Sequence, residues 1–104
     1  MPKLPKNYVM IQRRFPKVMA SHEQTGMLAS EAGPLDAKTG HLIQLAACVA
    51  LHSEGGVHSH ARRALQAGAS EAEIYHTLAL LINTVGFPNT AAAFSWVNDL
   101  FKKK

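Results

Sequence analysis

The chain has 104 residues, of which 47% are hydrophobic and 17% are charged, and its formal net charge is +4. This composition is typical of a folded globular domain and favours it over a disordered chain. No apolar run approaches the roughly 18–20 residues of a membrane-spanning helix, and no signal-peptide core follows the N-terminal lysines. We therefore expect a cytoplasmic protein that does not interact with membranes.

The positive charge is concentrated at the two ends of the chain. Residues 1–17 contain five basic residues and no acidic one, and residues 102–104 are all lysines. All seven acidic residues lie in the region between these two segments, and that region holds only three basic residues. The central region has no basic patch with interleaved aromatic residues, so we predict no nucleic-acid binding. We predict a basic N-terminal arm over residues 1–14 and a single helical domain over residues 15–104.

Helical periodicity predicts an all-α fold, a compact bundle of about five helices without strands. The predicted helices run from Pro16 to about Leu28, from Asp36 to about Leu51, from Val57 to Gln66, from Ser70 to about Val85, and from Asn89 or Thr90 to Phe101. The second helix has little polar face, which indicates a central, buried position. So much apolar surface in a short chain favours association with other copies.

Two helix starts have clear local signals. Asp36 is placed to cap the second helix, because its side chain can accept from exposed backbone N–H groups. Ser70 and Glu73 have the spacing of a capping box, which predicts the start of the fourth helix. Gly55-Gly56 and Gly86-Phe87-Pro88 are predicted to separate helices.

Cys48 is the single cysteine of the chain, so an intramolecular disulfide is excluded. Its neighbours from Leu45 to Leu51 are all apolar. Apolar surroundings raise the pKa of a thiol and disfavour the reactive thiolate. We therefore interpret Cys48 as a buried, inert thiol.

An ordered set of short motifs extends over about two-thirds of the chain. It comprises Leu35-Asp36-Ala37-Lys38-Thr39, the segment from His60 to Ser70, Glu73-Ile74, and the Gly86-Phe87-Pro88 break before an alanine-rich helix. With these motifs the chain resembles the carboxymuconolactone decarboxylase family, which includes the alkylhydroperoxidase-D (AhpD) proteins. The resemblance implies an all-α fold and assembly as a homotrimer or homohexamer.

In the AhpD branch the resemblance implies a site made of a glutamate, a Cys-x-x-Cys motif and a histidine. These positions fall on His41, Ser53, Gly56 and His60. A peroxide-reducing dithiol needs a thiolate and a resolving thiol, which serine and glycine do not supply. Peroxidase activity of the AhpD type is therefore disfavoured.

In the decarboxylase branch the resemblance implies a site without cysteines that keeps the histidine. His60 is the candidate to deliver a proton to a dienolate, and Arg62 or Arg63 is the candidate to hold a carboxylate. Ser53, in the same turn, is a further candidate for substrate contact. The predicted function is decarboxylase- or lyase-type acid–base chemistry on a small anionic molecule, without a cofactor.

His41 and His60 are also candidates for an acid–base couple. If the chain turns back at Gly55-Gly56, the two histidines lie roughly 9–10 Å apart along the helix axis. Contact would then need a steep helix crossing or a His41 from a neighbouring subunit. Two alternatives stay open: a non-catalytic binding or scaffold protein, and a metal site in which His58 or Glu54 joins the pair.

Overall fold

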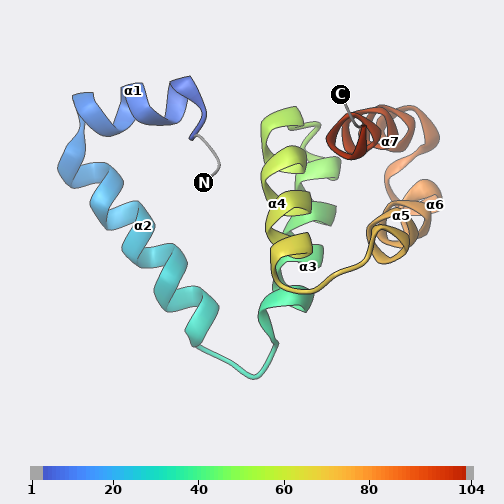
Figure 1. Ribbon diagram of the computed structural model, residues 1–104, viewed down its shortest axis with the longest axis horizontal. Helices are drawn as coiled ribbons and strands as arrows, with labels where there is room; N and C mark the ends of the chain where they lie inside the picture. The colour runs from blue at the N-terminus through green and yellow to red at the C-terminus, as the bar shows by residue number, and fades with distance from the viewer. Residues whose placement is uncertain (1–3, 103–104) are drawn as a thin grey trace. The chain divides into compact units, whose positions relative to one another are not determined.

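The computed structural model describes residues 4–102, and all the regular structure among them is helical (Figure 1). The helices are α1 (Lys6–Arg14), α2 (Pro16–Glu31), α3 (Ala37–Ala50), α4 (Glu54–Gln66), α5 (Glu71–Leu80), α6 (Ile82–Val85) and α7 (Phe87–Phe101). The all-α prediction is confirmed. Over the described range, each helix is too short or too polar to cross a membrane.

The chain divides into two compact units, and the division follows Pro34. The first unit contains α1 and α2, and the second contains α3 to α7. The predicted boundary at residue 14, between a basic arm and a single helical domain, stays a prediction. Within the first unit α1 packs with α2: the Tyr8 hydroxyl donates to the carboxylate of Glu23, and the Gln12 amide donates to the same carboxylate at 3.0 Å.

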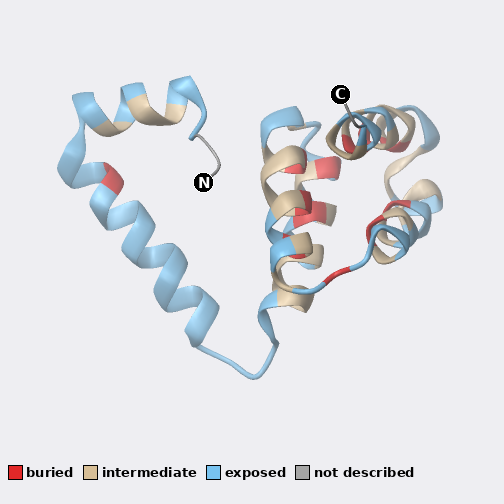
Figure 2. Cartoon of the chain, in the orientation of Figure 1, coloured by how far each residue is buried: buried red, intermediate tan, exposed pale blue. Residues whose placement is uncertain are grey.

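The hydrophobic core lies in the second unit, where α3 and α4 form a hairpin that packs against α5 and α7 (Figure 2). Its buried side chains are Leu45, Val49, Val57, Ala61, Ala64, Ala69, Ile74, Leu78, Ala93 and Val97. Burial of each large aliphatic side chain contributes about 1.5–3 kcal/mol. The small alanines on α4 and α7 allow these helices to approach closely. Among the described residues of the first unit, Met19 is the one buried residue.

The two predicted helix starts are confirmed. The Asp36 carboxylate accepts from the Thr39 N–H at 2.8 Å, where α3 begins. At α5, Ser70 accepts from the Glu73 N–H at 3.0 Å, and Glu73 accepts from the Ser70 N–H at 2.9 Å. Glu73 also pairs with Lys38 at 3.1 Å, which links α5 to α3.

The turn between α3 and α4 comes earlier than the sequence indicated. α3 ends at Ala50, His52 adopts a left-handed conformation with φ 57°, and α4 begins at Glu54. The Ser53 hydroxyl accepts from the Gly56 N–H at 3.1 Å and so caps α4. Because this cap satisfies an exposed backbone donor, both glycines lie inside the first turn of the helix instead of forming the connection.

The end of the bundle also differs from the prediction. The predicted fourth helix is divided at Leu81 into α5 and α6, and α1 forms in the segment predicted as an arm, so the described residues contain seven helices instead of about five. Gly86, with φ 105°, separates α6 from α7. α7 begins at Phe87, earlier than Asn89, because Pro88 is tolerated in a first turn, where its missing N–H has no intrahelical partner.

Candidate functional site

The α3–α4 hairpin brings His41 and His60 into direct contact within one chain. Their Nδ1 atoms are 3.3 Å apart, and their ring centroids are separated by 5.6 Å with an interplanar angle of 33°. Both side chains are half-buried. The separation of roughly 9–10 Å along the helix axis that the sequence predicted is therefore wrong. The contact forms within one chain and needs no second subunit.

The earlier turn explains this contact. A hairpin that turns near His52 places His60 opposite about Gln44, since each lies eight residues from the turn. His41 lies three residues before Gln44 on α3, which places it about 4.5 Å further from the turn along the helix axis. Two imidazole side chains span that distance, whereas a turn at Gly55-Gly56 would separate them by a further turn of helix.

The surroundings of the pair favour its uncharged form. Burial, followed by the positive charge of Arg63, lowers the pKa of His41 below its ordinary 6.5. Burial, Arg63 and then the charge of His41 lower the pKa of His60 in the same way. An interaction with the Gln44 side chain acts in the opposite direction on the pKa of His41. Both imidazoles are therefore mainly neutral at pH 7.

Ser53 and Gly56, where the resemblance implies two cysteines, are residues that shape the turn. Ser53 uses its hydroxyl to cap α4. Gly56 packs against Cys48: a Cβ at this glycine would lie 2.5 Å from the Cys48 Sγ and 2.9 Å from the Ser53 Oγ. Cys48 is half-buried, and burial raises the pKa of its thiol. The sulfur is thus a neutral packing group beside a position that has no room for a side chain.

The two candidate arginines differ in their relation to the histidines. Arg63 is exposed and lies three residues after His60 on α4, and its charge acts on both imidazoles. Arg62 is half-buried and has no such effect on either pKa. Gln44 was missed by the sequence analysis. Its spacing of three residues from His41 on one helix was the signal that could have identified it.

His58, one of the two residues considered as a further metal ligand, has another partner in Trp96, and His52 lies beside that residue. The ring of His58 bonds through Nε2 to the Trp96 carbonyl at 3.0 Å, so this nitrogen is the donor. His52 meets the Trp96 ring edge-on at a centroid distance of 5.1 Å. Among residues 4–102, no three His, Cys, Asp or Glu side chains converge as a set of metal ligands.

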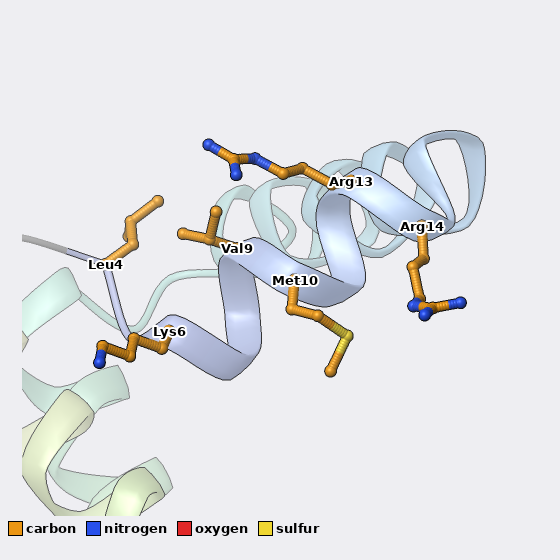
Figure 3. Close-up of a pocket in the computed structure, with 6 residues that line it drawn as sticks. All are labelled: Leu4, Lys6, Val9, Met10, Arg13 and Arg14. Carbon is orange, nitrogen blue, oxygen red and sulfur yellow. The ribbon is translucent and has the colours of Figure 1, made fainter.

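A separate hollow of about 400 Å³ lies on the first unit (Figure 3). It is lined by Leu4, Lys6, Val9, Met10, Arg13 and Arg14. These residues belong to α1 and the segment just before it, and none of the predicted site residues is among them. The hollow is therefore distinct from the histidine pair.

Comparison with known proteins identifies the family of the chain. The sequence model of the carboxymuconolactone decarboxylase family matches residues 16–99, and the chain belongs to this family. An uncharacterized protein from Haemophilus influenzae (strain ATCC 51907 / DSM 11121 / KW20 / Rd) is 36% identical over 59 residues, which are 57% of this chain and 52% of the relative. The chain thus spans about half the length of that relative.

A solved structure supports the fold. The crystal structure of an apo carboxymuconolactone decarboxylase family protein from Legionella pneumophila matches with a TM-score of 0.80 at 24% sequence identity. The match covers 93% of this chain and 88% of the Legionella chain. At this level of identity, the similarity shows a shared helical fold.

Proposed function

We propose that the protein transfers protons through the His41–His60 pair to a small anionic molecule, in chemistry of the decarboxylase or lyase type. The observation that carries this proposal is the 3.3 Å contact between the two Nδ1 atoms beside the charge of Arg63. Two coupled imidazoles whose pKa values lie below 6.5 respond to small changes in their surroundings near physiological pH.

The charge of Arg63 favours an anion as the ligand. A guanidinium close enough to lower the pKa of both histidines also attracts a carboxylate and repels a divalent cation. This argues for an anionic substrate over the alternative of a metal site. Arg62, on the adjacent position of α4, is the second candidate to contact the anion.

Anion binding and proton uptake are coupled at such a site. A bound carboxylate offsets the charge of Arg63, which raises the pKa of His60 and lets it take a proton from solvent. In a decarboxylation, the bond between carbon and the carboxylate breaks, CO₂ leaves, and the electron pair enters a conjugated dienolate. The protonated His60 then delivers its proton to carbon, so that a carboxylate anion and one proton become the product and CO₂.

The cysteine position argues against thiol peroxidase chemistry. Cys48 has a raised pKa and no second cysteine in the chain to resolve a sulfenic acid. Ser53 is engaged as a helix cap, and Gly56 has no space for a side chain. A role of Ser53 in substrate contact would have to use the same hydroxyl that caps α4.

Decarboxylation of carboxymuconolactone by the intact protein tests the proposal. We expect His60→Gln to lower the rate at least about 100-fold, the usual contribution of a general acid. His76→Gln, which changes an exposed histidine on α5, is the matched control. A rate that survives His60→Gln contradicts the proposal.

The second candidate function is binding without turnover, as in a scaffold or ligand-binding member of the family. It is favoured by the same Arg63 charge, which needs no proton transfer to hold an anion. Calorimetric titration with the lactone separates the two functions. Binding that Arg63→Gln weakens, together with no product formation, supports the non-catalytic alternative.

We also propose that the chain forms a homotrimer or homohexamer. The second unit exposes large apolar side chains at Ile43, Leu51, Leu80 and Phe87, with exposed fractions from 52% to 76%. Covering this surface would remove apolar area from water. Sedimentation analysis or light scattering of the purified protein should give three or six copies, and a monomer at micromolar concentration would contradict the proposal.

A further inference from the structure

We propose that the basic hollow on α1 is a docking site for a second copy of this chain, which inserts Leu51 and Glu54 of its α3–α4 turn. The inference rests on the homotrimer or homohexamer proposed above and names two surfaces that meet in it. It does not depend on proton transfer by the histidine pair.

The first unit has too little internal packing to hold its two helices. α1 has 9 residues and α2 has 16, yet Met19 is the one buried residue among those described in this unit. Short helices are marginal in water, and in proteins most of their stability comes from packing of an apolar face. Leu4, Met10 and Phe15 are instead 47–57% exposed. The unit therefore needs a surface outside itself.

The hollow on α1 combines apolar and cationic side chains (Figure 3). Its lining divides into three apolar and three basic residues, which are Leu4, Val9 and Met10, and Lys6, Arg13 and Arg14. Val9 and Arg13 are four residues apart and so share one helix face. Residues 4–17 contain no acidic residue, and within the described chain the three basic side chains make no ion pair. A complementary surface must offer an apolar side chain with a carboxylate beside it.

The α3–α4 turn presents this combination. Leu51 is 76% exposed, the largest exposed fraction among the large apolar side chains of residues 4–102. Glu54 follows three residues later, exposed in the first turn of α4. Its carboxylate has no ion pair with any described residue. The turn thus has an uncovered apolar side chain and an unpaired negative charge within one turn of chain.

The other exposed apolar side chains of the second unit lack such a carboxylate. No acidic residue occurs within three positions of Ile43, Leu80 or Phe87. Leu35 is followed by Asp36, but that carboxylate already accepts from a backbone N–H at the start of α3. The α3–α4 turn is therefore the surface that matches the hollow in both polarity and charge.

The two surfaces are different, which decides the symmetry of the contact. Two hollows that faced each other would bring six cations together, so a two-fold contact through this face is disfavoured. A hollow of one copy that receives the turn of the next copy makes a head-to-tail contact, and repetition of such a contact closes a ring. One ring of three copies, or two such rings, gives the proposed number of subunits.

Charge reversal on each surface of the intact protein tests the contact. Arg13→Glu with Arg14→Glu, or Glu54→Arg alone, should weaken association at least about tenfold in sedimentation analysis, because like charges then meet. Lys17→Glu is the control for the first unit, since Lys17 is exposed on α2 outside the hollow. Glu71→Arg is the control for the second, because Glu71 begins α5 as Glu54 begins α4. Both controls should associate like the unmodified protein.

Mixing the two kinds of variant tests whether the contact joins different copies. A tagged copy with Arg13→Glu and Arg14→Glu should capture an untagged Glu54→Arg copy at least about tenfold better than it captures its own kind, because opposite charges meet again. This result separates a contact between copies from an effect of the charges on a single chain. Circular dichroism of each variant checks that the helices are retained.

Several results would overturn the proposal. Equal capture in both mixtures, or association that neither charge reversal weakens, refutes this contact and leaves the proposed assembly standing. Calorimetric binding of octanoate that is lost with Arg13→Glu and Arg14→Glu, while association persists, would assign the hollow to a small amphipathic anion instead. An unmodified protein that is monomeric would refute the assembly together with the contact.

Discussion

Replacement of Gly56 by alanine is expected to destabilise the protein, although alanine normally favours a helix. The new Cβ would lie 2.5 Å from the Cys48 Sγ, 2.9 Å from the Ser53 Oγ and 3.1 Å from the Cys48 Cβ. Ordinary contacts between such atoms are about 3.5–4.0 Å. The first turn of α4 or the end of α3 must therefore shift by roughly 1 Å.

The magnitude follows from two opposing effects. Overpacking of a tight site costs about 1–3 kcal/mol, whereas alanine in place of glycine gains about 0.5–1 kcal/mol in a helix. The expected net loss is about 1–2 kcal/mol, which lowers Tm by roughly 4–15 °C in a domain of this size. Gly55→Ala is the control, because nothing lies within 4 Å of its Cβ position and only the gain remains.

Thermal or urea unfolding followed by circular dichroism measures both variants. A double variant with Cys48→Ala removes the closest atom, the sulfur, so Gly56→Ala should cost less in that background than in the unmodified protein. If Gly56→Ala proves as stable as Gly55→Ala, the packing of Cys48 against this turn is wrong.

Three further changes test the electrostatics and the capping. The pKa values of His41 and His60 in the folded protein lie below the ordinary 6.5, so the unfolded chain takes up protons more readily than the folded one. The contribution of the pair to the free energy of unfolding should therefore be fully present above about pH 6.5 and be lost as the pH falls toward the folded pKa values. Replacement of both histidines by glutamine should flatten a plot of Tm against pH in this range. Arg63→Gln should raise the pKa of both histidines in an NMR titration, and an unchanged pKa would remove Arg63 from the site. Ser70→Ala should reduce the free energy of unfolding by about 1 kcal/mol through loss of the capping box, as urea denaturation would show; no loss would mean that the cap does not hold α5.

Much of the fold could be predicted from local signals in the sequence. Asp36, Ser70 and Glu73 start helices where their side chains accept from the backbone, and the structure retains each of these contacts. The same kind of signal was overlooked at Ser53, because the following Gly55-Gly56 was interpreted as a connection. A capping serine before two glycines is a helix start when the glycines fit its first turn.

The position of the turn between α3 and α4 decided how much of the site could be predicted. His41 and His60 were identified as candidates, but their distance depends on the hairpin register, which no local pattern fixes. The influence of Arg63, in contrast to Arg62, depends on the helix face that each occupies relative to the pair. Gln44 is an exposed side chain, and its spacing of three residues from His41 is the one sequence signal that relates it to the pair.

The most direct test of the central claim is an NMR titration of the His41 and His60 rings in the intact protein, repeated with saturating carboxymuconolactone. Our account predicts that both pKa values lie below 6.5, that the first proton shifts the signals of both rings together, and that the bound anion raises the pKa of His60. Independent titration of the two rings near 6.5, unaffected by the anion, would contradict a coupled proton-transfer site.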